Sequence, residues 1–209
     1  MADGVKINDL LKQLYDAKKD QYDFHDMVEF NSCLTRKLII REIDEFTGST
    51  LGQYIQFYNE LDEQNEIPVE ERIPIKIYLD SPGGDMSSTF TAIDSIRMSK
   101  TPVWTINVGM SYSGGFFIFI AGHKRFAYNL SSFLFHEGAT MAGGDAGKFR
   151  NYTDFYKKQL EKLKNLTLDY TKITNEQYEK HINDDWWIDA TEALELGICD
   201  EIIIDELIY

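Results

Sequence analysis

The sequence predicts an α/β fold with a largely parallel sheet, because one pattern occurs twice along the chain. In each repeat an apolar strand runs into glycine residues and then into a helix; the strands are 75–79 and 103–108, and the glycines lie in 81–84 and 109–115. Strands that alternate with helices in this way usually form parallel sheets with helices packed on their faces. The length of 209 residues, 43% of them hydrophobic, suits a single domain of this class.

The elements follow in order from the spacing of apolar residues. Residues 1–30 are expected to form an N-terminal appendage with one short amphipathic helix, and residues 31–209 the domain itself. Thr174 with Gln177, and Asp189 with Glu192, have the spacing of capping boxes and predict two helix starts. The pattern predicts strands at 38–40, 75–79, 103–108, 133–135 and 202–204, and helices at 51–61, 86–96 and 149–170.

The charge of the chain argues against several classes of partner. There are 21 basic and 35 acidic side chains, a formal net charge of −14. A chain this acidic, without a run of lysine or arginine, repels nucleic acid and anionic membranes. No segment has the apolar length of a membrane span or of a signal peptide, so we expect a cytoplasmic protein.

The two cysteines give no reason to expect a metal or a disulfide. Cys33 and Cys199 are far apart and belong to no C-x-x-C pair. This arrangement is typical of neither a disulfide framework nor a cysteine zinc site, and we expect no cofactor.

Two glycine-containing turns could carry chemistry. The segment 109–115 holds Ser111 and Ser113 between a strand and a helix, where a serine can be an exposed nucleophile or simply cap the helix. The other turn ends in Gly83 and Gly84, a pair that is also typical of a plain tight turn. If both turns meet at one edge of the sheet, the backbone N–H groups of Gly84 and Gly114 could form an oxyanion hole.

A serine nucleophile also needs a base and a group that orients the base. Among the four histidines, His136 is distinctive because it directly follows the apolar strand 133–135 and should emerge from the core at an edge. A single histidine in such a place is often structural. The pair Asp184 and Asp185 precedes an aromatic segment, so an aspartate there would be partly desolvated and could hold an imidazole.

Taken together, these motifs resemble the proteolytic subunit family of the Clp protease, within the superfamily of Clp peptidases and crotonases. The matching pieces occur in the family's order from about Leu38 to Ile203. They are the segments 78–84, 109–115, 135–136, 185–190, 192–193 and 196–198. The departures at Tyr112, Gly114 and Glu137 indicate a divergent member.

The resemblance implies a fold of repeated β-β-α units with a handle helix at about 147–172. It also implies site roles: Ser113 as nucleophile, His136 as general base and Asp185 as its orienting group. By the same resemblance Gly84 and Gly114 are the oxyanion donors, and the strand edge near Gly143 and Gly144 binds an extended peptide.

The family resemblance further implies a homo-oligomer of two stacked heptameric rings that encloses a chamber for unfolded polypeptides or peptides. A separate AAA+ unfoldase of the ClpX, ClpA or ClpC type would feed the chamber, because this chain contains no P-loop. Three alternatives stay open: a peptidase similar to signal peptide peptidase A, a catalytically silent ring subunit, and a crotonase-like acyl-CoA enzyme.

Overall fold

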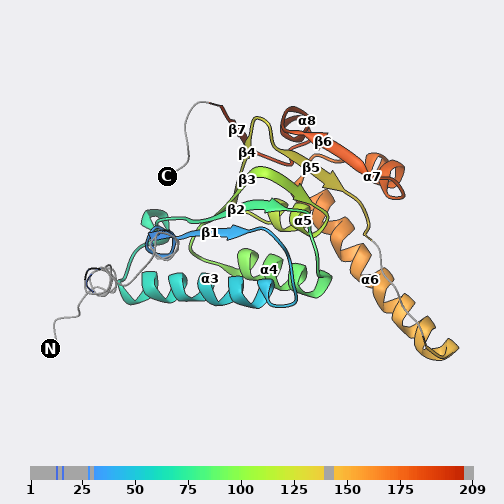
Figure 1. Cartoon of the computed structure of the whole chain (residues 1–209), viewed down its shortest axis with the longest axis horizontal. Coiled ribbons are helices and arrows are strands. Elements are labelled where there is room, and N and C mark those ends of the chain that lie inside the picture. Colours follow the sequence, from blue (N-terminus) through green and yellow to red (C-terminus); the bar gives the residue numbers. More distant parts are fainter. Residues whose placement is uncertain (1–12, 14–15, 17–27, 29–30, 139–143, 205–209) are drawn as a thin grey trace.

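The structure is a computed structural model that describes residues 13, 16, 28, 31–138 and 144–204 (Figure 1). Its centre is a seven-stranded sheet flanked by helices, so the predicted α/β class is confirmed. The expected appendage at 1–30 lies outside the described residues, apart from residues 13, 16 and 28. No helix in the described part of the chain is long and apolar enough to cross a membrane.

Five parallel strands form the main path of the sheet. Their order is β1 (Lys37–Ile40), β2 (Ile75–Ser81), β3 (Val103–Tyr112), β4 (Lys124–Tyr128) and β7 (Glu201–Ile203). Two further strands leave this path: β5 (Ser132–Phe135) runs parallel to the second half of β3, and β6 (Trp186–Asp189) pairs antiparallel with β5.

Strand β3 is longer than the sequence pattern predicted. The expected strand ended at residue 108 with Gly109 in a turn, but the observed strand continues through Gly109 to Tyr112. At Gly109 the strand passes close to the Asp80 side chain: a Cβ there would lie 2.4 Å from Oδ1 of Asp80, so that side chain would have to move. Strand β4 was not predicted, since its polar start, Lys124 and Arg125, hides the alternation of a strand.

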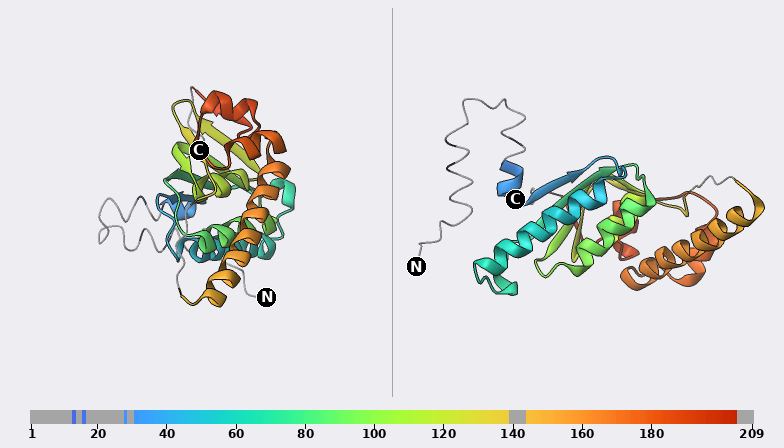
Figure 2. Two further views of the ribbon diagram at one scale, coloured as in Figure 1. Left: turned by 90° about the vertical axis from the view of Figure 1, so that its right-hand side faces the viewer. Right: turned by 90° about the horizontal axis from the view of Figure 1, so that it is seen from below.

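Two long helices pack on one face of the sheet (Figures 1 and 2). Helices α3 (Thr47–Gln64) and α4 (Met86–Met98) lie side by side beneath it (Figures 1 and 2). Helix α5 (Gly114–Ile120) has all seven residues buried, as expected of a short helix enclosed on every side. The smaller elements are a 3-10 turn at Val69–Glu71, α7 (Asn175–His181) and α8 (Ala190–Glu195).

Helix α6 (Ala146–Tyr170) covers the predicted helix at 149–170 and protrudes from the body (Figure 1). Of its 25 residues only Leu163 and Thr167 are buried, both in the second half. Its first half leaves Phe149, Tyr152 and Phe155 exposed, so this part of the helix is not held by the domain core.

The predicted helix starts are present at α7 and α8. Thr174 and Gln177 form the complete capping box, with both reciprocal hydrogen bonds. At α8 the Asp189 side chain accepts from the Glu192 N–H, but Glu192 accepts from the indole of Trp186. The second pair therefore makes one half of the box.

A buried ion pair ties the first strand to α3 and β2. Arg36 donates two hydrogen bonds to the Asp62 carboxylate, at 2.8 and 2.6 Å, and a third to the carbonyl of Ile73. Thr101 donates to the same carboxylate at 2.7 Å. Burial raises the pKa of Asp62, but the hydrogen bonds from Arg36 and Thr101 and the positive charge of Arg36 lower it more, so the net shift is downward.

We expect Asp62→Ala to lower the free energy of unfolding by about 3–5 kcal/mol in urea titrations, because it leaves the Arg36 guanidinium buried without a counter-charge. The control is Glu63→Ala, whose carboxylate forms an exposed pair with Lys100 and should matter little. Equal effects of the two substitutions would contradict this account.

The same pair gives a pH dependence. The pKa of Asp62 is lower in the folded chain than in the unfolded chain, where it is about 3.9. The stabilisation that the Asp62 carboxylate provides is therefore complete above about pH 5 and is lost as the pH falls through the folded-state pKa. In urea titrations at decreasing pH, the difference in the free energy of unfolding between the wild type and Asp62→Ala should become smaller.

Candidate active site

Ser113 occupies the turn between β3 and α5 in a strained conformation. Its φ is +52° and its ψ −118°, a region that a residue with a side chain rarely adopts. Its N–H donates to the carbonyl of Leu134 at 2.9 Å, which fastens the turn to β5. Its side chain makes no capping hydrogen bond, so the capping interpretation is wrong for this serine.

The register of two strands brings His136 and Asp185 together. In the antiparallel pair Phe135 lies opposite Trp186, so the residues that follow and precede them face each other. His136 Nδ1 lies 3.1 Å from Asp185 Oδ1. Residues 49 positions apart in the chain thus form one hydrogen-bonded pair at the end of β5.

The His136 and Asp185 pair is more exposed than the sequence suggested. The side chain of His136 is 30% exposed and that of Asp185 is 56% exposed. The expectation of a desolvated aspartate beside indole rings is wrong for this chain, because Trp187 points outward and is itself 57% exposed. Trp186 turns the other way and stacks on His181 at 4.1 Å between ring centroids.

Ser113 and His136 line the same cavity. Within the described residues, no hydrogen bond joins Ser113 Oγ to the His136 imidazole, and only the contact between His136 and Asp185 is made. A bond between a catalytic serine and its base is often long before substrate binds. Ser111 is fully buried, and its Oγ has no partner among the described atoms.

The two glycine turns meet beside Ser113, as the sequence predicted. A Cβ on Gly83 would lie 2.8 Å from the Cβ of Ser113, and one on Gly114 would lie 3.6 Å from the nitrogen of Gly84. In the described part of the chain the N–H groups of Gly84 and Gly114 donate to no backbone carbonyl. Two unpaired donors therefore lie next to the serine, which is the arrangement an oxyanion requires.

Gly84 makes a close backbone contact with the segment that follows β1, and this contact requires glycine. It forms an isolated bridge to Ile43, in which the Ile43 N–H donates to Gly83 and the Ile43 carbonyl accepts from Asp85. Its φ is +151°, and a Cβ would lie 2.0 Å from the Ile43 carbonyl oxygen. Only glycine fits this position.

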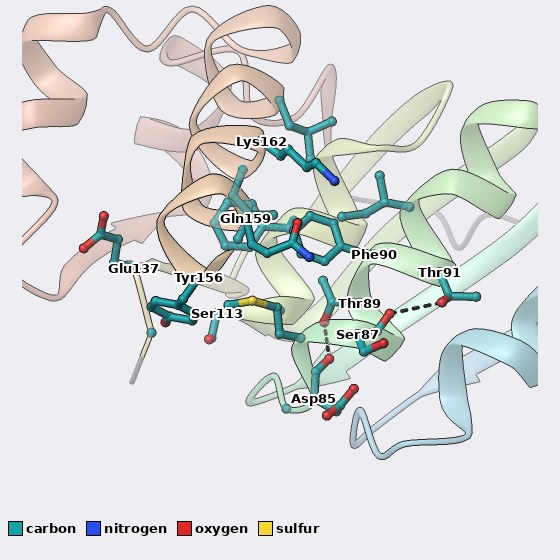
Figure 3. A pocket seen from close by; sticks show the side chains of 18 of the residues that line it. Asp85, Ser87, Thr89, Phe90, Thr91, Ser113, Glu137, Tyr156, Gln159 and Lys162 are labelled. Carbon is teal, nitrogen blue, oxygen red and sulfur yellow. Dashed lines mark hydrogen bonds between the residues drawn. The ribbon is translucent and has the colours of Figure 1, made fainter. Parts of the chain in front are cut away.

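The cavity beside Ser113 has a volume of about 920 Å³ and lies between α4 and α6 (Figure 3). Its walls hold both apolar and polar side chains, and Gln159 and Lys162 line it from α6. The sequence reading missed these two residues, although Gln159 interrupts the apolar stripe formed by Tyr156, Leu163 and Leu166.

Glu137 also lines this cavity, directly after His136. Partial burial raises the pKa of Glu137, and the negative charge of Glu179 raises it further. Of the two glycines expected to bind peptide, Gly144 has a φ of +133° and open space around it, and Gly143 lies outside the described residues. No group of three or more metal-ligating side chains occurs in the described residues.

Comparison with known proteins decides the family. A sequence model of the Clp protease family matches residues 35–206. The chain belongs to the Clp protease family. The resemblance drawn from the motifs is thereby confirmed.

Two relatives show how far this Clp-family chain has diverged. They are ATP-dependent Clp protease proteolytic subunits 2 from Treponema pallidum and Treponema denticola, 34% and 33% identical over 132 and 131 residues. The matched region is 62% of this chain and 66% of each relative, slightly less than two thirds of their length.

A solved structure supports the Clp-family fold. A ClpP1 mutant from Listeria monocytogenes superposes with a TM-score of 0.72 and 22% identity, covering 86% of this chain and 97% of the other. The α/β architecture with its mostly parallel sheet therefore matches that of a ClpP structure.

We expect Gly84→Ala to destabilise the protein strongly, because the methyl group would overlap the Ile43 carbonyl as well as strain φ. The matched control is Gly138→Ala, where φ is +81° but nothing lies within 4 Å of a Cβ. In urea titrations the free energy of unfolding should fall by about 1–3 kcal/mol in the control. A decrease for Gly84→Ala that is no larger than this would disprove the close contact.

Proposed function

We propose that the chain is a serine endopeptidase that hydrolyses peptide bonds through Ser113, His136 and Asp185. The observation that carries the proposal is the strained Ser113 beside two unpaired backbone N–H groups. His136 lines the same cavity and would be the base, and Asp185, which lies 3.1 Å from its Nδ1, would be the orienting carboxylate. Membership in the Clp protease family supports the same reaction.

The proposed reaction has two steps. Ser113 Oγ attacks the substrate carbonyl carbon while His136 takes the hydroxyl proton, and the N–H groups of Gly84 and Gly114 stabilise the oxyanion. His136 then gives the proton to the departing amine, which leaves an acyl-enzyme. Water, activated by His136, hydrolyses the ester and restores the serine. Asp185 keeps the imidazole in the required tautomer throughout.

The assembly belongs to the same proposal. We infer that copies of the chain form two stacked heptameric rings, with the exposed aromatic residues of α6 covered between subunits. The peptide would lie along the strand edge near Gly143 and Gly144. The relatives are named as ATP-dependent, and this chain carries no P-loop, so a separate AAA+ unfoldase would deliver unfolded polypeptide.

The central test is the loss of activity in Ser113→Ala. Peptide cleavage should fall by at least about a thousandfold, and a fluorophosphonate probe should no longer label the protein. Ser111→Ala is the matched control, because it removes a buried hydroxyl that has no partner. Unchanged turnover in Ser113→Ala would overturn the proposal.

Activity should also depend on the His136 imidazole. We expect His136→Ala to lose peptide cleavage, measured as kcat/KM, because no other group of the proposed triad can accept the serine proton. Unchanged kcat/KM in this variant would argue against His136 as the base.

One observation favours a second candidate, a catalytically silent ring subunit. Ser113 Oγ and His136 make no hydrogen bond in the described residues, and Asp185 is largely exposed. A silent subunit would assemble normally yet fail to react with the fluorophosphonate probe. Labelling of the wild type at Ser113 excludes it.

A further inference from the structure

The two proposed oxyanion donors belong to different parts of the chain. Gly84 follows β2 and Gly114 begins α5, so their N–H groups can bind one oxygen only if the two turns keep a fixed relative position. A displacement of about 1 Å in an active site can lower the rate by about a hundredfold. A side chain that holds the two turns together would therefore influence catalysis without touching the substrate.

Thr89 is hydrogen-bonded to the first of these turns. It lies in the first turn of α4 and is 2% exposed. Its Oγ1 donates to the carbonyl of Asp85 at 2.8 Å, and its N–H donates to the same carbonyl at 3.0 Å (Figure 3 shows the first of these bonds). Asp85 directly follows Gly84, and its own N–H donates to the carbonyl of Ile43 at 2.7 Å. The Thr89 side chain is thus fastened to the backbone beside the first donor.

The same hydroxyl packs against the second turn. A Cβ added to Gly114 would lie 2.6 Å from Oγ1 of Thr89, much closer than an ordinary van der Waals contact, and 3.6 Å from the nitrogen of Gly84. The φ of Gly114 is not positive, so its backbone conformation does not require glycine. The space that Thr89 occupies therefore explains why residue 114 has no side chain.

Thr89 thus contacts both halves of the proposed oxyanion hole. We propose that Thr89 is a positioning residue that sets the distance between the N–H groups of Gly84 and Gly114, and with it the stabilisation of the oxyanion. This role rests on the proposed peptidase function. The branched side chain is stiff and buried, so it can hold the two turns in one arrangement. Its hydroxyl proton is already donated to Asp85, so Thr89 acts through the backbone and is not a third oxyanion donor.

The test moves a methyl group from one side of the contact to the other. Thr89→Ala opens a space, Gly114→Ala puts a methyl group against Oγ1 of Thr89, and the double variant places that methyl group in the opened space. Thr89→Ser is the conservative variant, because it keeps the oxygen. Ser95→Ala is the matched control: Ser95 also lies on α4, donates to the carbonyl four residues earlier at 2.7 Å and packs beside a glycine, Gly52. The measured quantities are kcat and KM for one fluorogenic peptide.

We expect Thr89→Ala to lower kcat about ten- to a hundredfold and to change KM by less than about twofold, because the oxyanion exists only after the serine has attacked. Gly114→Ala should lower kcat at least as much. The double variant should recover kcat at least about tenfold over Gly114→Ala, since the closest remaining neighbour of the methyl group is Cδ1 of Ile43 at 3.2 Å. Thr89→Ser and Ser95→Ala should keep most of the wild-type kcat.

Three results would overturn the positioning role while leaving the peptidase standing. The first is a kcat of Thr89→Ala equal to that of Ser95→Ala. The second is a Thr89→Ser variant no more active than Thr89→Ala. The third is a double variant no more active than Gly114→Ala, since two independent losses simply add. A wild type that neither cleaves the peptide nor reacts with the fluorophosphonate probe would instead refute the proposed function, and the role of Thr89 with it.

Discussion

The change of partner along β3 is the constraint on which the site depends. Its first half, at Trp104–Asn107, pairs with β4, and its second half, at Met110–Tyr112, pairs with β5. A strand can have only one neighbour on each side, so β5 takes the place of β4 beside the second half of β3. Strand β6 then pairs with β5, and these two strands leave the main path of the sheet. The turn at Ser113 is then hydrogen-bonded to β5, and the end of β5 carries His136.

Backbone packing then shapes the rest of the site. Gly84 can approach the chain after β1 because it has no side chain, and this contact holds its N–H beside that of Gly114. Helix α5, fully buried, begins at the Ser113 turn, where the N–H groups of Phe116 and Phe117 donate to the Ser113 carbonyl. The chemically important donors are thus main-chain groups, which are placed by the fold and not by side-chain rotamers.

The candidate site lies at the edge of the structure, and this position leaves some of its side chains exposed to solvent. Strand β6 is an outer strand that pairs with β5, so Asp185 before it and Trp187 within it remain accessible to solvent. The cavity between α4 and α6 is lined by apolar side chains such as Phe90 and Leu163 and by polar ones such as Thr89.

The fold class and the two glycine-containing turns of the candidate site could be predicted from the sequence alone. Alternation of apolar residues marked most of the strands and α6, and glycines followed by helices marked Gly84, Ser113 and Gly114. The length of β3, the presence of β4 and the exposure of Asp185 became visible only in the three-dimensional structure. These depend on contacts between segments far apart in the chain, such as Gly109 against Asp80 or α6 against α4, and no local pattern encodes them.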